Sequence, residues 1–543
     1  MKNTDIVFVV PSATPLLQEE SIGTLILAKK LILSGYNVQI VRFWEIEGFK
    51  NQYKSFRENL ISRILATSAE LVSFYCRCTD YHICIDIADG LKLHAPNVLI
   101  SFGGPQAELV AKETMTYYPF IDYICCSEGE NTIVPFMKFI AGGHSTLEAK
   151  TIPGLTYRNE HGIIIQNELP ELLCDNYARN FDYYDIIPES VVKNSYRTSI
   201  DVGRGCPFGC SFCSTKTFWK QKFRLRDIKD MVDEIERVVN NYGITTFDFD
   251  HDLFTVNKKR VIEFCHEIEK RNLKIKWFCS SRIDTIDTEM IDVMVQSGMV
   301  KILFGIETGS PRMQRMINKN LNLRNCSEIV TYCVNRGVKV LASFIYGLPD
   351  DTEDDFEQTF RMIVSMRYSG AKIMLWLCGI LNGTALYNNY KEKLILQDEN
   401  IKNRSFFGYQ ETVNAIIKDH IDIFPQFCDF HNDLRFKLRF FELFYSVWMI
   451  AVPKTFHYIA KFLVDKKLRF LDLYYKFCRV NSDILSSAKY SDENIFWGIQ
   501  SSQIITAIRK LVDELVTNEP SPFTENEISA LNKLLALELK KVQ

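Results

Sequence analysis

The sequence contains the stretch Gly203-Arg204-Gly205-Cys206-Pro207-Phe208-Gly209-Cys210-Ser211-Phe212-Cys213. Its three cysteines follow C-x3-C-x2-C spacing, and no fourth cysteine or histidine lies close enough in sequence to complete a four-ligand zinc site. Thiolates suit iron–sulfur clusters and zinc alike, but a four-iron cluster normally takes four cysteines. The loop therefore predicts a cluster with one open iron held by Cys206, Cys210 and Cys213, with structural zinc as the alternative.

This loop resembles the signature of the radical S-adenosylmethionine (SAM) superfamily, in which a C-x3-C-x2-C loop carries a [4Fe–4S] cluster and SAM binds the open iron. Phe212 fits the aromatic residue that the family usually has before the third cysteine. The resemblance implies an enzyme that cleaves SAM reductively to a 5′-deoxyadenosyl radical. It also implies an electron donor such as flavodoxin or ferredoxin.

The composition is that of a soluble globular protein. The 543 residues are 47% hydrophobic and 24% charged, and this length predicts two to four domains. The net charge of −3 gives no electrostatic footprint for nucleic acid. The sixteen cysteines read as reduced thiols rather than a disulfide framework. No signal peptide or transmembrane segment is expected, since the longest apolar run, residues 443–452, is far shorter than the ~20 residues of a span. A cytoplasmic location follows.

Residues 1–150 alternate short apolar strands with helical segments. Strand following helix, with strands that are apolar throughout, predicts a doubly wound, Rossmann-like parallel sheet covered on both faces. The expected strands are residues 6–10, 38–41, 71–74, 98–102 and 123–126.

Ligands in such sheets bind at the carboxyl ends of the strands, where Ser73, Gly103 and Gly104 fall. Paired glycines let a ligand approach the backbone, although a tight turn would also explain them. Together with Gly129 in the segment 127–130, this region resembles the cobalamin-binding domain that precedes the radical SAM domain in one large subclass. Cobalamin is therefore the third cofactor implied.

One departure concerns the axial ligand of cobalamin. Many cobalamin domains have a D-x-H-x-x-G motif after the first strand, whose histidine replaces the lower axial base. Residues 11–17 here contain no histidine. Because many members of the radical SAM subclass also lack it, the resemblance still implies cobalamin binding, with an empty domain as the alternative.

The middle of the chain predicts a linker and then a barrel. Residues 151–194 form a linker with a hairpin whose turn is at 159–162. Residues 195–395 again alternate strands and helices, and six strands match the partial (β/α)6 TIM-type barrel of the family. Besides the strand before the cysteines, these are residues 245–249, 276–280, 300–305, 339–344 and 372–377.

Loops after these strands carry the residues that the resemblance assigns to SAM: Asp250, His251, Ser280, Arg282, Glu307, Tyr346 and Gly347. A structural salt bridge is the alternative for the segment 250–252. Ser310 and Pro311 suit the N-cap and first turn of a helix, which explains that loop without function. No residue is assigned a catalytic role.

Residues 396–543 predict an α-helical C-terminal domain rich in aromatic residues, Phe406 and Phe407 among them. At helical spacing such residues usually form core. The wall of an apolar substrate pocket and a contact with a membrane surface remain as alternatives. The last predicted helix, within residues 521–543, has Thr524 as its N-cap.

Residues 5 to about 390 resemble a cobalamin-dependent radical SAM enzyme. The family implies C-methylation of an unactivated carbon. The alternatives are a radical rearrangement or cyclisation without methyl transfer, a radical SAM enzyme whose first domain is a docking platform, and a non-enzymatic corrinoid or redox sensor. The substrate, whether a natural-product intermediate, a peptide or a lipid, is not encoded in these motifs.

Overall fold

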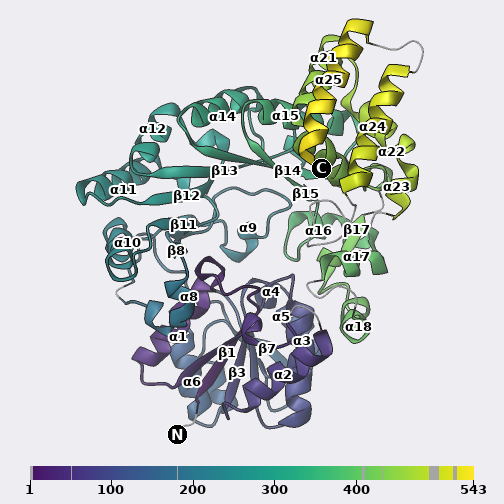
Figure 1. The fold of residues 1–543 in the computed structure, drawn as a ribbon. Coiled ribbons are helices and arrows are strands. Elements are labelled where there is room, and N and C mark those ends of the chain that lie inside the picture. Colours follow the sequence, from purple (N-terminus) through teal and green to yellow (C-terminus); the bar gives the residue numbers. More distant parts are fainter. Residues whose placement is uncertain are drawn as a thin grey trace. The chain divides into compact units, whose positions relative to one another are not determined.

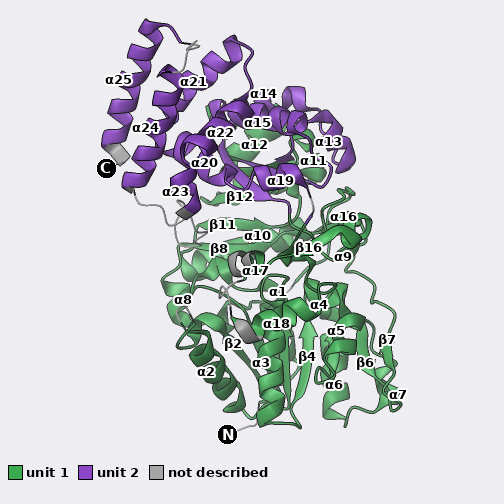
Figure 2. Cartoon of the chain, turned by 90° about the vertical axis from the view of Figure 1, so that its right-hand side faces the viewer, with its two compact units in different colours: residues 1–305, 332–341, 379–429 green, residues 306–331, 342–378, 430–543 purple. Residues whose placement is uncertain are grey.

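The computed structural model describes residues 4–49, 52–179, 181–405, 410–430, 432–487, 501–517 and 523–542. The chain divides into two compact units (Figure 2). The first consists of Met1–Gly305, Tyr332–Leu341 and Gly379–Asp429, and the second of Ile306–Thr331, Ala342–Cys378 and Phe430–Gln543. Unlike the four predicted segments, each unit combines several separate stretches of chain.

The first unit begins with a seven-stranded sheet in the order β2-β1-β3-β4-β5-β6-β7. Strands β1 to β5 pair in parallel, which confirms the predicted doubly wound sheet. Every residue of β1 is buried, so its run of apolar side chains has core on both faces. The strands are β1 (Ile6–Val10), β2 (Val38–Arg42), β3 (Leu71–Tyr75), β4 (Leu99–Gly103), β5 (Tyr123–Cys125), β6 (Leu155–Arg158) and β7 (Ile164–Gln166).

Helices cover both faces of this sheet. Figure 1 shows α1 and α6 on one side of it and α2 and α3 on the other, and each pair encloses its own hydrophobic core. The helices are α1 (Ile22–Leu33), α2 (Tyr53–Leu65), α3 (Tyr81–His94), α4 (Pro105–Leu109), α5 (Ala111–Tyr117), α6 (Ile133–Ala141) and α7 (Thr146–Ala149).

The hairpin predicted within the linker belongs to this first sheet. Strand β6 pairs antiparallel with β5, and β7 pairs antiparallel with β6. Its turn lies where expected, with the amide of Gly162 donating to the carbonyl of Asn159 at 2.9 Å. The sheet therefore extends beyond residue 150, because the apolar side of the hairpin finishes an edge that would otherwise be unpaired.

A second sheet has six strands in the order β15-β14-β13-β12-β11-β8. It is open, since β8 and β15 are its edges, as expected for a partial barrel. Strands β8, β11, β12 and β13 pair in parallel. The six predicted strands are confirmed as β8 (Arg197–Asp201), β11 (Thr246–Asp250), β12 (Lys276–Ser281), β13 (Met299–Glu307), β14 (Lys339–Tyr346) and β15 (Lys372–Leu377).

Helices and one small hairpin accompany this second sheet. Aromatic stacking fills part of its core, with the rings of Phe249 and Trp277 4.7 Å apart. Ser310 caps α13 as predicted, accepting from the amide of Met313. The elements are α8 (Glu189–Lys193), β9 (Gly203–Arg204), α9 (Thr215–Phe218), β10 (Arg224–Leu225), α10 (Ile228–Tyr242), α11 (Lys258–Lys270), α12 (Thr288–Gln296), α13 (Pro311–Met316), α14 (Cys326–Asn335), α15 (Glu353–Tyr368) and α16 (Ala385–Tyr390).

The C-terminal part of the chain is helical, but it serves both units. Helix α18 packs against α3 in the first unit, so residues 410–429 cover the first sheet's helices. The later helices belong to the second unit. The elements are β16 (Leu394–Leu396), α17 (Asp398–Arg404), α18 (Glu411–Asp419), β17 (Cys428–Phe430), α19 (Asp433–Lys437), α20 (Phe441–Tyr445), α21 (Pro453–Asp465), α22 (Phe470–Val480), α23 (Ser482–Ser487), α24 (Ser501–Thr517) and α25 (Glu525–Val542).

Most of the predicted aromatic core is buried. Phe441, Phe444 and Trp448 are fully buried, whereas Phe436 is 66% exposed. Phe406 and Phe407 lie outside the described residues. Thr524 caps α25 as expected, because its hydroxyl accepts from the amide of Glu527. Among the residues described, no helix is both long and apolar enough to cross a bilayer.

Replacing Phe441 by alanine should destabilise the second unit. Its ring contacts Phe356, Phe360 and Tyr474 at centroid distances of 4.8–5.7 Å, so the truncation leaves a cavity worth ~3–5 kcal/mol in the free energy of unfolding. Urea denaturation followed by circular dichroism measures it. Phe436→Ala is the control, since removing an exposed ring should cost under ~0.5 kcal/mol. Equal losses in the two variants would contradict the assigned core.

Candidate functional site

The cysteine loop is carried by a short hairpin. Strands β9 and β10 pair antiparallel, with Gly203 opposite Leu225. Gly205 then turns the chain at φ +84°, and a Cβ there would lie 2.0 Å from the carbonyl oxygen of Lys222. Only glycine fits both the left-handed backbone and this close approach. The residue before the first cysteine is therefore dictated by the turn that starts the loop.

The three cysteines of the loop are half-buried. Burial first, and then the neighbouring Cys213, Asp252 and Cys210, raise the pKa of Cys206 to about 11. The thiols of Cys210 and Cys213 are therefore close enough to Cys206 to act on it electrostatically. No three histidine, cysteine or carboxylate side chains among the described residues converge on a single metal ion. In an iron–sulfur cluster each cysteine binds a different iron, so the three thiols of the loop fit the predicted cluster.

Asp252 ties the two ends of the cysteine loop together. One carboxylate oxygen accepts from the amide of Gly205 at 3.1 Å, and the other accepts from the hydroxyl of Thr215 at 3.2 Å. Within the loop, the amide of Cys213 donates to the carbonyl of Cys210 at 3.2 Å. Asp252 belongs to the predicted segment 250–252, but its role here is to position the loop.

His251 is buried with both ring nitrogens engaged by backbone. Nδ1 accepts from the amide of Leu253 at 2.7 Å, so Nε2 carries the hydrogen and donates to the carbonyl of Arg224 at 3.4 Å. Burial lowers the pKa of His251 to about 4, which keeps the ring neutral. The imidazole also explains Gly203, where a Cβ would lie 2.7 Å from the ring.

Asp250, at the end of β11, is one of the carboxylates that line the neighbouring cavity. Desolvation, followed by the charges of Asp201 and Asp252, raises the pKa of Asp250 to about 6, although Arg204 opposes this. A cationic group placed beside it would relieve the repulsion among the three carboxylates.

A buried ion network joins the cysteine loop to the first sheet. The guanidinium of Arg204 donates to Glu128 at 3.0 Å, to Glu130 at 2.5 Å and to Asp201 at 3.2 Å. Glu128 also accepts from Arg224 at 2.8 Å. The sequence analysis did not assign Arg204. The sequence did carry a signal for this network: a basic residue inside the cysteine loop, and two carboxylates after the last parallel strand.

A cavity of about 440 Å³ lies where the ends of β3, β4 and β5 meet the hairpin and β11. Six predicted residues line it: Ser73, Gly103, Gly104, Gly129, Asp250 and His251. Its opposite wall comes from the segment after the third cysteine, which the sequence analysis missed: Ser214, Thr215, Phe218 and Trp219. Small, polar and aromatic residues directly after a cluster loop were the only hint of this wall.

The strand ends around the cavity suit a polar ligand. The hydroxyls of Ser12, Ser101 and Ser127 are buried without a hydrogen-bond partner among the described residues, and Ser127 lines the cavity. A Cβ at Gly103 would have only the carbonyl of Cys125 nearby, at 3.7 Å. Unsatisfied hydroxyls beside open backbone fit the amides and phosphate of a corrinoid.

Gly104 has a structural reason instead. Its φ is +99°, and a Cβ there would lie 2.9 Å from the carbonyl oxygen of Cys76. Gly129 is similar, since a Cβ would meet the side chain of Leu27 at 2.8 Å. Of the three predicted glycines, Gly103 alone keeps open space in front of its backbone.

Arg282 lies beside the cysteine loop. Its guanidinium stacks over the ring of Phe208 at 3.8 Å, and Nη1 is 4.0 Å from the sulfur of Cys210. Asp284 holds it through two hydrogen bonds of 2.8–2.9 Å. Ser280 lies on β12 opposite Leu303, and Phe212 is half-buried within the loop.

Glu307, Tyr346 and Gly347 belong to the second unit. Glu307 adopts φ +68° and forms a buried ion pair with Lys319 at 2.7 Å. A non-glycine residue held in this conformation is strained, which is common at functional sites. Tyr346 donates to Glu442 at 2.8 Å.

Residues from the C-terminal part of the chain hold the turn after β14. The guanidinium of Arg435 donates to the carbonyl of Gly347 at 3.0 Å. The side-chain amide of Asn432 donates to the carbonyls of Leu348 and Pro349 at 3.0 and 2.7 Å. The predicted SAM-facing turn therefore takes its shape from residues more than eighty positions later.

Two sequence families match the chain. Residues 200–363 match the radical SAM superfamily, and residues 10–136 match the B12 binding domain. The first match includes the cysteine loop, and the second includes the strand ends that line the cavity.

Relatives in other organisms are similar to about half of the chain. An uncharacterized methyltransferase of Pyrococcus horikoshii is 30% identical, covering 54% of this chain and 66% of its own. An anaerobic magnesium-protoporphyrin IX monomethyl ester cyclase of Cereibacter sphaeroides is 29% identical, and the match covers 55% of this chain and 48% of the cyclase. The cytidylyl-2-hydroxyethylphosphonate methyltransferase of Streptomyces wedmorensis is 27% identical, and the match covers 54% of this chain and 60% of that methyltransferase. The matches thus span about half to two thirds of these relatives.

Two solved structures have the same fold. The radical SAM methyltransferase TsrM of Kitasatospora setae, with cobalamin and a [4Fe–4S] cluster bound, aligns with a TM-score of 0.58 at 16% identity, covering 72% of this chain and 75% of that one. The cobalamin-dependent SAM radical enzyme OxsB, with aqua-cobalamin and SAM bound, aligns with a TM-score of 0.62 at 13% identity. The alignment covers 99% of this chain and 84% of OxsB. At these identities the likeness concerns the fold.

Replacing Cys206, Cys210 or Cys213 by alanine should abolish the cluster. Anaerobically reconstituted wild-type protein should hold about four irons and four sulfides per chain, and each variant should hold close to none, because two thiolates do not retain the cluster. Iron and sulfide analysis measures this. Cys174→Ala is the control, since Cys174 is an exposed free thiol outside the loop. A variant that kept full iron content would remove its cysteine from the ligand set.

Proposed function

Because the chain carries a radical SAM domain and a B12 binding domain, we propose that it is a cobalamin-dependent radical SAM enzyme that methylates an unactivated carbon of its substrate. The observation that carries the proposal is the cavity of the first unit. Its wall combines strand ends of the B12 binding domain with the segment after the cluster cysteines. Two cofactors bound from opposite walls would share this space.

Each part of the site has a distinct task in this proposal. Cys206, Cys210 and Cys213 would hold the cluster, and the orphan hydroxyl of Ser127 would bind the corrinoid beside Gly103. When bound, these groups and SAM supply reductive cleavage of SAM and transfer of a methyl group.

The protein's own residues orient and shield those groups. Asp250 would hold the ammonium group of SAM, and Asp252 keeps the cysteine loop in place through Gly205 and Thr215. The rings of Phe218 and Trp219, edge to face at 4.5 Å, form an apolar wall that excludes water from the cavity.

A second candidate is a radical rearrangement or cyclisation that uses the same cofactors without methyl transfer. It is favoured by one observation, since the relatives include ester cyclases as well as methyltransferases. Product mass separates the two functions, because methylation adds one CH2 to the substrate. Either function needs an external one-electron donor and a small-molecule or peptide substrate.

SAM affinity should fall as the pH drops through about 6. Below the raised pKa of Asp250, a proton occupies the carboxylate that would bind the ammonium group. Affinity should be about fourfold weaker at pH ~5.5 than at pH ~7.5. Equilibrium dialysis with labelled SAM measures this.

Two variants make that measurement specific. Asp250→Asn should bind SAM more weakly at both pH values and lose the pH dependence. Asp465→Asn, at an exposed position on α21, should behave as the wild type. An unchanged fourfold dependence in Asp250→Asn would assign the titration to another group.

Corrinoid retention should depend on Gly103. Reconstituted protein incubated with cobalamin and desalted should keep about one corrinoid per chain, measured by absorbance after extraction. Gly103→Leu should lose most of it, because the side chain would fill the space in front of β4. Gly379→Leu is the control, since a Cβ added at Gly379 would also meet little and Gly379 is not among the residues that line the cavity.

The outcomes also separate the alternatives. No corrinoid in the wild type, with SAM still cleaved to 5′-deoxyadenosine, would exclude the methyltransferase and leave a radical enzyme whose first domain serves another purpose. Retained corrinoid without any SAM cleavage under reducing conditions would indicate a sensor.

A further inference from the structure

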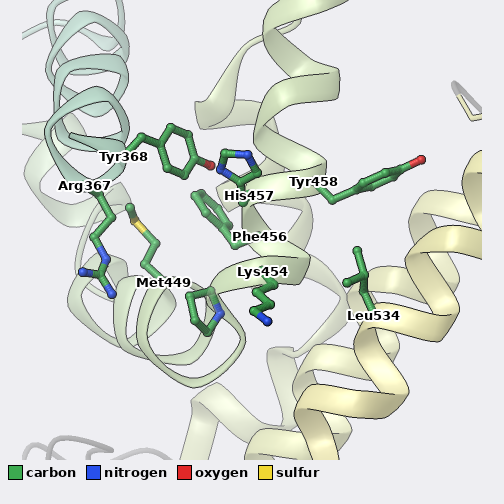
Figure 3. Close-up of a pocket in the computed structure, with 9 residues that line it drawn as sticks. Arg367, Tyr368, Met449, Lys454, Phe456, His457, Tyr458 and Leu534 are labelled. Carbon is green, nitrogen blue, oxygen red and sulfur yellow. The ribbon is translucent and has the colours of Figure 1, made fainter. Parts of the chain in front are cut away.

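The second unit has a pocket of its own, which the proposed function does not use. It measures about 470 Å³, within the usual range for small-molecule sites, and lies among α15, the segment before α21, α21 itself and α25. Its apolar wall includes Met449 and Phe456, each 1% exposed, together with Leu534. Figure 3 shows Tyr368 and His457 facing each other across one side. Their rings are edge to face at 4.2 Å.

The charges around this pocket have one sign. Arg367 and Lys454 line it, and neither side chain has an ion-pair partner among the described residues. In Figure 3, Arg367 lies beside Met449, and Lys454 lies on the side of Leu534. The described residues that line the pocket include no carboxylate. The nearby Glu538 already accepts from the backbone amides of Lys454 and Thr455 at 2.8 Å.

The backbone that supplies Met449 is irregular. Ser446–Ala451 forms a π-helix directly before α21. Single π-turns of this kind recur at functional sites, because widening the helix shifts a side chain away from its usual position. The pocket thus combines an apolar wall, an uncommon backbone segment and two unpaired cations.

We propose that this pocket binds a small amphiphilic anion, with a carboxylate or phosphate head at Lys454 and an alkyl or aromatic body against Tyr368 and Leu534. The apolar lining would bury the body, Lys454 would form a charge-assisted hydrogen bond with the head, and Arg367 would add positive potential from the side of Met449. Tyr368 and His457 add hydrogen-bonding groups at the rim. The inference is independent of the cofactors of the first unit.

The test uses the full-length, cluster-loaded protein and the fluorescent anion 8-anilinonaphthalene-1-sulfonate as the probe. Decanoate and decyl phosphate should displace the probe, whereas decanol and decyltrimethylammonium should displace it at least ~tenfold less well, because neither offers a negative head. The relative strength of decanoate and decyl phosphate identifies the preferred head group. Displacement by decanol as strong as by decanoate would overturn the proposal.

Charge reversal provides the matched variants. Arg367→Glu combined with Lys454→Glu should weaken decanoate at least ~tenfold and favour decyltrimethylammonium. Lys461→Glu, an exposed residue of the same helix outside the pocket, should leave the affinity unchanged. If the double variant fails to fold, as reported by far-UV circular dichroism, Lys454→Gln should still weaken decanoate severalfold. Equal affinity in Lys454→Gln and wild type, or binding to phosphatidylglycerol vesicles without displacement by decanoate, would refute a small-molecule site.

Discussion

The first unit depends on the buried ion pairs that the guanidinium of Arg204 forms. The guanidinium faces the carboxylates of Glu128, Glu130 and Asp201, all of them buried or nearly so. Moving charges out of water costs several kcal/mol per ion, and that cost is offset only when every partner is in place. Burial alone would raise the pKa of Asp201, but Arg204, with Arg179, holds it at about 2. The network is therefore stable in one arrangement, which sets the loop after β5 against the start of the cysteine loop.

The chemistry of the cavity follows from this arrangement. Arg204 compensates the charges of the acidic residues beside it in the cavity wall, His251 is neutral, and Asp252 is engaged with the cysteine loop. Asp250 is then the carboxylate that faces the cavity with a raised pKa. In the proposed function, Asp250 would face a cationic cofactor, and the orphan hydroxyl of Ser127 would face a polar macrocycle.

The second unit is organised by aromatic packing instead of buried charge. Phe441 and Phe444 pack against α15, the helix that follows β14, and against α22. The same C-terminal region shapes the turn at Gly347 through Arg435. Its aromatic residues are thus chiefly core, and its pocket draws on residues at the margin of that core.

The sequence by itself determined the parallel sheets, the cysteine loop and six of the residues that line the cavity. These depend on local properties: strands that are apolar throughout, a glycine required at Gly205, and thiols at fixed spacing. The tertiary structure decided what depends on distant partners. It joined the hairpin of β6 and β7 to the first sheet, gave residues 410–429 to the first unit, and paired Arg204 with carboxylates about seventy-five positions earlier. A charged residue carries no local mark of its partner, because an ion pair is specified only when folding brings both groups out of water together.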